Sequence, residues 1–321
     1  MRPFLILLLL VGPAAGAGAG LSTVALAKVD AGADASAGQV KDSSSEAKAA
    51  FERGRAAHNA RKTDEAVSAF ERAVALEPTS SLYHLWLGHA YSRQLSSAGF
   101  LRKPFIARRS GEAYDMAVKL DPTSIAAAEG RLEFLLGAPG IVGGGVDKAR
   151  AEAARIATLD AYRGRMAEAR IAEHEKKWPE AERLYRSLIT EYPDRTAALD
   201  ALVTILQNAS RFDEAFKIVE DRLARLPDES SSLYNLGRLA AVSGQHLARG
   251  EAALRRFLAM TGADPVRQSN AHYRLGMIKE KMGDAHAAAA EYQAAIDLYP
   301  RHEPAAAALK KIQGGRNAPK R

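Results

Sequence analysis

Residues 269–300 read SNAHYRLGMIKEKMGDAHAAAAEYQAAIDLYP. Two segments rich in Ala, Leu, Lys and Glu, which favour helix, flank a turn at Gly283. The first segment carries a small residue at Gly276, and the second carries Tyr292 on one face. Pro300 ends the second segment, because proline cannot continue a helix. The stretch therefore predicts a hairpin of two helices that cross at a small residue.

The same residue types recur along the chain with a period of about 34 residues. Three pairs of like residues lie 34 positions apart, namely Gly54 and Gly88, Ala181 and Ala215, and Pro193 and Pro227. The small residue expected where two helices cross is supplied by Gly54, Gly88, Gly237 and Gly276. The proline stop is used after Leu-Glu, Leu-Asp and Leu-Tyr at Pro78, Pro122 and Pro300. One hairpin cannot bury its apolar face alone, so the repeats are expected to stack.

This pattern resembles the tetratricopeptide repeat family, whose 34-residue unit has set Leu-Gly, Tyr, Ala, Phe, Ala and Pro positions. Leu87-Gly88 with Tyr91 matches the first helix of the unit. The second-helix positions are matched by Ala66, Phe70, Ala73 and Pro78. Seven copies start near residues 47, 81, 125, 162, 196, 230 and 269. The resemblance implies an all-α fold, an α-solenoid of helical hairpins with a capping helix from Glu303 to Ile312.

The N-terminal segment predicts export. Arg2 gives a positive start, residues 4–11 are an unbroken apolar run, and Ala25-Leu26-Ala27 is a small-x-small cleavage site. We expect cleavage after Ala27 and a periplasmic or secreted mature protein. The residues that follow are poor in large apolar side chains, which predicts a flexible linker. The predicted organisation is a signal peptide over 1–27, a linker over 28–45, the repeat solenoid over 46–313 and a basic disordered tail over 314–321.

Composition and motifs argue against catalysis. The chain has no Cys, which excludes disulfides and thiolate chemistry, and its net charge of +7 over 321 residues is too mild for a nucleic-acid binder. No His-Glu-x-x-His, Gly-x-Ser-x-Gly or nucleotide-binding fingerprint occurs. The Gly-rich segment 137–145 is followed by Val146-Asp147 where a phosphate-binding loop needs Lys and Ser or Thr. We therefore expect a structural loop there, and no enzyme activity, cofactor or metal site.

Two copies carry insertions. The first lies within residues 94–110 and combines four large apolar with four basic residues, Phe100, Leu101, Phe105 and Ile106 with Arg102, Lys103, Arg108 and Arg109. We expect its apolar residues to pack on the stack, because most apolar residues of such segments are structural. The alternative is that they dock an acidic partner or a membrane surface. In the second insertion, Ile141 and Val142 are expected to fold back onto apolar surface.

The family resemblance implies that the first helices line a concave groove that binds a protein or peptide. The partner-binding residues expected there are Arg55, His89, Arg93, Arg170, Asn208, Tyr234, Arg238 and Tyr273. The same register points five carboxylates inward, those of Glu129, Glu133, Glu173, Asp200 and Glu280, so the groove charge is mixed. The family's carboxylate clamp is not matched, because Phe51 and Arg55 stand where it needs Lys and Asn.

These features predict an exported scaffold or adaptor that binds a protein of the cell envelope, with no stable membrane span after processing. Two alternatives remain open at this point. The chain could be a membrane-tethered envelope assembly factor, if the N-terminal segment is retained and the basic insertion touches lipid. It could instead bind a glycan or peptidoglycan fragment, with Tyr234 and Tyr273 stacked on sugar rings. The sequence names neither the partner nor the oligomeric state.

Overall fold

The computed structural model describes residues 44–260 and 264–316, and helix is the only regular structure in this part of the chain. A first helix is described over residues 44–59. The longer helices that follow are α2 (Thr63–Leu76), α3 (Ser81–Ser97), α4 (Lys103–Leu120), α5 (Ile125–Gly137), α6 (Val146–Leu159), α7 (Ala161–His174), α8 (Trp178–Glu191), α9 (Ala197–Asn208), α10 (Phe212–Arg225), α11 (Ser230–Ser243), α12 (Leu247–Met260), α13 (Pro265–Lys281), α14 (Ala285–Leu298) and α15 (Glu303–Arg316). Consecutive helices pair into seven hairpins within the described residues, and α15 follows them. The predicted all-α repeat array is confirmed.

The ends of the array differ slightly from the predicted boundaries. Helix is already present at residue 44, inside the predicted linker, and α15 continues to Arg316, inside the predicted tail. In α15, Ala305 and Leu309 are buried and Ile312 packs against the last hairpin, while Lys310 is exposed. The helix therefore caps the stack as expected. The predicted signal peptide, most of the linker and the last residues of the tail lie outside the described residues.

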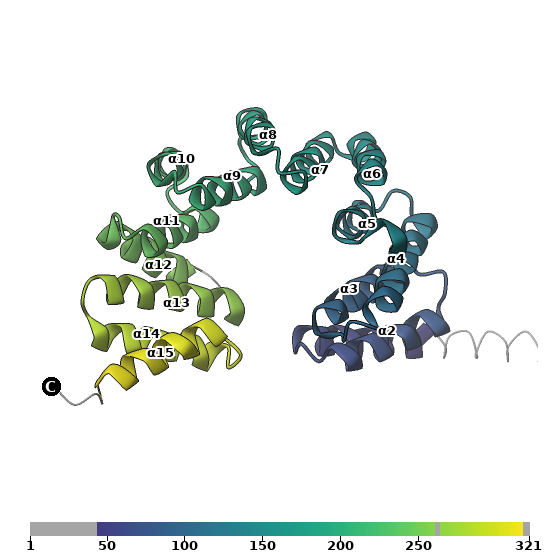
Figure 1. The fold of residues 1–321 in the computed structure, drawn as a ribbon, viewed down its shortest axis with the longest axis horizontal. Helices are drawn as coiled ribbons and strands as arrows, with labels where there is room; N and C mark the ends of the chain where they lie inside the picture. Colours follow the sequence, from purple (N-terminus) through teal and green to yellow (C-terminus); the bar gives the residue numbers. More distant parts are fainter. Residues whose placement is uncertain (1–43, 261–263, 317–321) are drawn as a thin grey trace, which may run out of the picture.

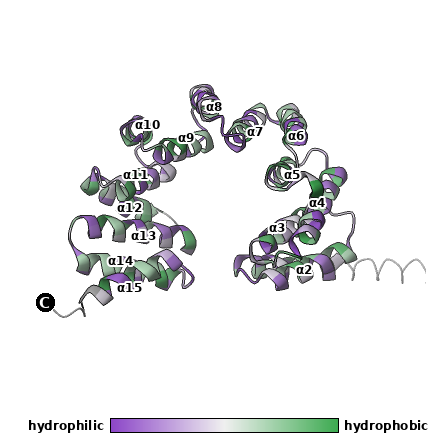
Figure 2. Cartoon of the chain, viewed as in Figure 1, coloured by the Kyte–Doolittle hydropathy of each residue, from purple (hydrophilic) through white to green (hydrophobic). Residues whose placement is uncertain are grey.

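The hairpins stack side by side into an arch (Figure 1). Helices α5, α7, α9 and α11 line its inner side, and α6, α8 and α10 form its outer side. Figure 2 shows that hydrophilic and hydrophobic residues alternate along these helices, as expected when each helix buries one face. The concave surface is therefore built from the first helix of each hairpin.

Glycine is required where the two helices of a hairpin cross. A Cβ added at Gly276 would lie 2.4 Å from a ring carbon of Tyr292, and one at Gly54 would lie 2.5 Å from the ring of Phe70. Atoms that are not bonded do not approach so closely, so a larger residue would push the helices apart. The same holds for Gly88 against Tyr114 and for Gly237 against Leu254, at 2.8 and 2.2 Å. The predicted crossing residues are confirmed.

The first insertion lengthens the second hairpin. Helices α3 and α4 have 17 and 18 residues, against 14 in α2. Ile106 is buried, as expected, but Phe100, Leu101 and Phe105 are exposed, so the prediction that they pack on the stack was wrong. These three residues lie in the turn between α3 and α4 and in the first turn of α4, where no other element covers them.

The second insertion is a structural loop between α5 and α6, as predicted. It contains the short 3₁₀-helix η1 (Gly140–Val142), and the Gly145 amide donates to the carbonyl of Leu135 at 2.8 Å. Val142 is partly buried, but the side chain of Ile141 is 94% exposed. The prediction that Ile141 folds back was wrong, because η1 places it at the outer end of the loop.

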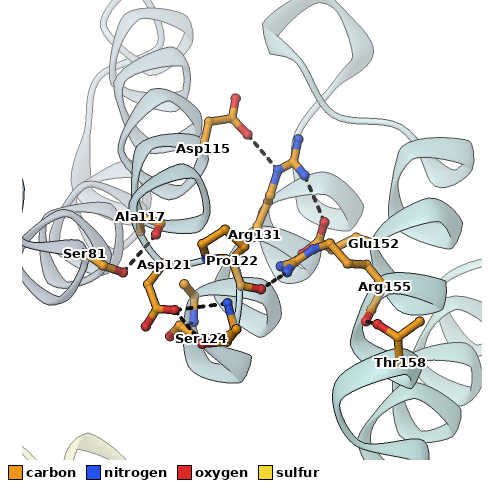
Figure 3. Close-up of polar contacts among 12 residues, drawn as sticks. Ser81, Asp115, Ala117, Asp121, Pro122, Ser124, Arg131, Glu152, Arg155 and Thr158 are labelled. Carbon is orange, nitrogen blue, oxygen red and sulfur yellow. Dashed lines mark hydrogen bonds and ion pairs between the residues drawn. The ribbon is translucent and has the colours of Figure 1, made fainter.

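A buried carboxylate joins the second and third hairpins (Figure 3). Glu152 on α6 is 2% exposed and accepts from Arg131 Nη1 at 2.9 Å and from Arg155 Nη2 at 2.6 Å. Arg131 also donates to Asp115 on α4, and Arg155 donates to the carbonyl of Pro122 in the turn before α5. Arginine contacts with a proline carbonyl of the preceding turn recur between Arg222 and Pro193 and between Arg256 and Pro227. These contacts fix how each hairpin sits on the one before it.

Candidate partner-binding groove

A hollow of about 310 Å³ opens on the inner side of the arch between α9, α11 and α13. It is lined by Asp200 of α9, by Ser231, Tyr234, Asn235 and Arg238 of α11, and by Arg267 and Asn270 of α13. Three consecutive first helices therefore contribute to one concave site, which we call the α11 hollow. Two of the eight residues predicted for partner binding, Tyr234 and Arg238, lie in it.

Asp200 holds the polar side of the α11 hollow in place. Its carboxylate accepts from Ser231 Oγ at 2.6 Å and from Asn235 Nδ2 at 2.6 Å. Asn235 is buried, so its amide needs such a partner. The carboxylate of Asp200 is thus hydrogen-bonded to neighbours within the protein. These hydrogen bonds link α9 to α11.

Arg238 has no carboxylate within ion-pair distance among the described residues. One guanidinium nitrogen donates to Thr204 Oγ1 at 3.2 Å, and its Nε is buried without a partner. Burial lowers the pKa of the Arg238 guanidinium below its usual value, and the positive charge of Arg274 adds to this effect. Arg274 on α13 also has a buried Nε without a partner. The two arginines make this part of the groove cationic.

The carboxylates predicted to face the groove all have partners. Glu129 pairs with Arg163 at 2.8 Å and Glu133 with Arg170 at 3.0 Å. Glu173 and Glu280 accept from the hydroxyls of Tyr185 and Tyr292, and Asp200 is bound as described above. Arginines therefore offset the charges of Glu129 and Glu133, whereas Glu173 and Asp200 accept from neutral groups and keep their negative charge. Around the α11 hollow, Arg238, Arg267 and Arg274 outnumber Asp200, so the net charge there is positive.

The remaining predicted residues are engaged differently along the groove. Arg170 lies beside a second hollow, of about 500 Å³, but is held by Glu133. Asn208 is exposed at the end of α9. Tyr273 packs against the rings of Tyr292 and His302, with centroids 5.8 and 4.9 Å apart. Their roles in partner binding stay predictions.

At the N-terminal end of the groove, Trp86 lies at the centre of an aromatic and basic cluster. The guanidinium of Arg55 lies 5.6 Å from the Trp86 ring, and the imidazole of His89 contacts it edge-on at 6.0 Å. His89 also bonds the Tyr114 hydroxyl at 2.9 Å, and Arg93 donates to the carbonyl of His58 at 2.7 Å. Arg93 therefore holds the first two hairpins together and His89 joins α3 to α4, and only Arg55 of the three is substantially exposed.

The first and last hairpins contact each other across the opening of the arch. Arg301, between α14 and α15, donates to the carbonyl of Ala60 at 3.2 Å. The guanidinium of Arg61 lies 5.3 Å from the ring centroid of Tyr299. Figure 1 shows the two ends facing each other. Side chains thus bridge the opening, and the groove is bounded by both ends of the array.

His58 makes the stability of this region dependent on pH. Burial lowers its pKa from 6.5 to about 4, and the nearby charge of Arg93 adds to the effect. Between these two values the unfolded chain binds a proton that the folded protein does not, so stability rises with pH across this window. We expect the melting temperature to fall as the pH is lowered from about 6.5 to about 4, and thermal unfolding monitored by circular dichroism measures it.

The matched variant is His58→Phe, which keeps a ring against Trp86 but cannot titrate. Its melting temperature should fall less steeply between about pH 6.5 and 4 than that of the wild type. An identical pH dependence in the two proteins would contradict the assignment to His58.

Several residues of the α11 hollow were missed by sequence reasoning, namely Ser231, Asn235, Arg267 and Asn270. A signal existed for one of them. Asn235 stands among apolar residues directly before Leu236-Gly237, on the face of α11 that packs inward. A buried amide at such a position implies a polar partner on the next helix. The others lie on exposed or partly exposed positions, where sequence gives no comparable constraint.

The described residues hold no group of three or more His, Asp or Glu side chains that could bind a metal ion. None of the described helices combines the length and the apolar character needed to cross a bilayer. The arrangement is a helical-repeat scaffold with a concave, locally cationic site.

Tetratricopeptide repeat family models match the chain at residues 269–302, at 163–195, and at 18–81 and 51–94. The resemblance to the tetratricopeptide repeat family that the sequence predicts is confirmed over these segments. The match over 18–81 begins within the segment predicted as signal peptide. No curated protein sequence matches the chain.

Among solved structures, the yeast Tom70 is similar to this chain with a TM-score of 0.69 and 16% identity. The similarity covers 86% of this chain and 55% of Tom70. A tetratricopeptide repeat protein from Parabacteroides merdae ATCC 43184 is similar with a TM-score of 0.49 and 14% identity, over 84% of this chain and 99% of that one. At such identity, the likeness to Tom70 shows the fold alone.

Proposed function

We propose that this protein is an exported scaffold that binds an extended segment of a partner protein in its concave groove, anchored at the α11 hollow. The observation that carries the proposal is the buried Nε of Arg238, which has no partner among the described residues. A cation removed from water without a compensating carboxylate is unfavourable, and a ligand carboxylate would offset that penalty. The role is binding, without catalysis or a cofactor.

The chemistry of the groove defines the segment it would take. Arg238 and Arg274 favour an acidic side chain or a C-terminal carboxylate. Tyr234 adds a partly buried aromatic face, a residue type that often anchors interfaces. The partner is expected in the cell envelope, because the N-terminal segment predicts export.

Site-specific crosslinking tests the proposal. A photoreactive amino acid replaces Tyr234 in the α11 hollow, and in a second protein it replaces Lys217, an exposed residue of the outer helix α10. Each protein is irradiated in an envelope extract of the source cells. We expect a protein crosslinked at position 234 and not at 217, with acidic residues or a C-terminus beside the crosslinked peptide. Equal crosslinking at both positions, or none at 234, would argue against the groove.

A further inference from the structure

The two insertions come together at one end of α4. This place in the fold is far from the α11 hollow. The two insertions surround an apolar pocket of about 670 Å³ between the α3–α4 turn and the η1 loop. Phe100 and Pro104 line it from the first insertion, and Ile141 and Val142 line it from the second. We call this paired feature the insertion tip.

The insertion tip exposes several large apolar side chains to solvent. The side chains of Phe100, Leu101 and Ile141 are 86%, 89% and 94% exposed, and Phe105 is exposed beside them. Single exposed apolar residues are common, but Phe100 and Ile141 line an apolar pocket, and Leu101 and Phe105 belong to the same insertion as Phe100. Such a concentration of exposed apolar side chains indicates a contact surface. Ile106, in the same insertion, is buried and anchors the segment, so the exposure is confined to the outer residues.

The charge beside this apolar surface is positive. Arg102 and Lys103 are exposed, and neither has a carboxylate within ion-pair distance in the part of the chain that the structure describes. Arg108 is exposed and its charge is shared with Glu112, and Arg109 pairs with Glu71. Glu133, the acidic residue that lines the pocket, is paired with Arg170. The unpaired charge at the insertion tip is therefore cationic, which favours an anionic occupant.

We propose that the insertion tip docks on an anionic phospholipid bilayer. A bilayer surface offers hydrocarbon to the loop-end side chains and, in the headgroup layer just outside it, phosphate groups to the adjacent cations. The pocket accepts an acyl segment between the two loops, which then covers Phe100 and Ile141 from both sides. This contact holds the scaffold at a membrane without a spanning helix and does not depend on what the groove binds.

The absence of Cys from the chain allows a local test. Ile141→Cys carries an environment-sensitive fluorophore, and Lys217→Cys carries the same label on the outer helix α10 as a matched control. The labelled full-length proteins are titrated with vesicles of phosphatidylglycerol and, separately, of phosphatidylcholine. We expect a blue shift and quenching by bromolipid at position 141 on phosphatidylglycerol only, and no change at 217. Because the label reports its own surroundings, binding by any other part of the chain does not imitate this result.

Two variants separate the contributions of charge and apolar surface. Arg102→Glu with Lys103→Glu should weaken the response of the label at 141 at least about 30-fold in lipid concentration, given about 1 kcal/mol for each basic residue at an anionic surface. Phe100→Ser with Leu101→Ser should abolish the bromolipid quenching. These residues are exposed, so far-ultraviolet circular dichroism should show unchanged helix content. No response of the label at 141 to phosphatidylglycerol vesicles would overturn the proposal, and so would a response that survives the charge reversal. A response of the label to added protein in the absence of vesicles would also overturn it and would assign the surface to a protein partner.

Discussion

Replacing Glu152 by Ala should destabilise the protein by about 3–5 kcal/mol, because it leaves two arginines around a buried position without their shared carboxylate. Glu152 is 2% exposed and is bound by Arg131 and Arg155 (Figure 3). The same arginines reach Asp115 and the Pro122 carbonyl, so the substitution also loosens the joint between the second and third hairpins. Urea unfolding followed by circular dichroism measures the loss.

Glu133→Ala is the matched control for this experiment. Glu133 also pairs with an arginine, Arg170, but its side chain is 59% exposed, and exposed pairs contribute only about 0–1 kcal/mol. In Glu152→Ala, the loss of protection against hydrogen exchange should be concentrated in α4 to α6, because each hairpin of a repeat array contacts mainly its neighbours. Equal destabilisation by the two variants would mean that the burial of Glu152 does not increase its contribution to the free energy of unfolding.

Much of the repeat architecture follows from local sequence. A hairpin needs a small residue and an aromatic residue at a fixed spacing, and Gly276 with Tyr292 meets this requirement through a contact within one hairpin. Gly54 with Phe70 has the same spacing, so this copy could be found without knowing the others. Gly88 meets Tyr114 across the longer second hairpin, and Gly237 meets Leu254 in place of an aromatic residue. The capping helix was predictable for the same reason, since its apolar face covers only the last hairpin.

Features that depend on several hairpins at once were not predictable. The contact of Arg301 with Ala60 joins residues 241 positions apart and depends on the curvature accumulated over the whole array. The exposure of Phe100 and Ile141 depends on where two loops end relative to their neighbours, which composition does not specify.

The candidate site also has features that the sequence could predict and features that it could not. The repeat register of the first helices predicts both Tyr234 and Arg238 on the groove side, and the two residues line one hollow. It could not show that Glu129 and Glu133 are offset by Arg163 and Arg170, because these pairing partners come from the adjacent copy. With these carboxylates offset, Arg238 and Arg274 leave a net positive charge around the α11 hollow, where Asp200 is the carboxylate that lines it.

Once crosslinking at position 234 has identified the bound segment, Arg238→Met should reduce its affinity by about 2–4 kcal/mol, or roughly 30- to 1,000-fold. The guanidinium is the buried cation of the hollow, and Met keeps most of its length without the charge. Isothermal titration calorimetry with the synthetic segment measures the change. Arg55→Met, which removes an exposed arginine paired with Glu52, should alter affinity less than about threefold.

Stability distinguishes a binding role for Arg238 from a structural one. The buried charge has no carboxylate partner, and its one side-chain bond, to Thr204, is worth about 1 kcal/mol. Removing the charge also removes its desolvation penalty, so Arg238→Met should unfold within about 1 kcal/mol of the wild type. A variant that binds as tightly as the wild type but unfolds much more easily would make Arg238 a structural residue and would move the anchor of the partner elsewhere in the groove.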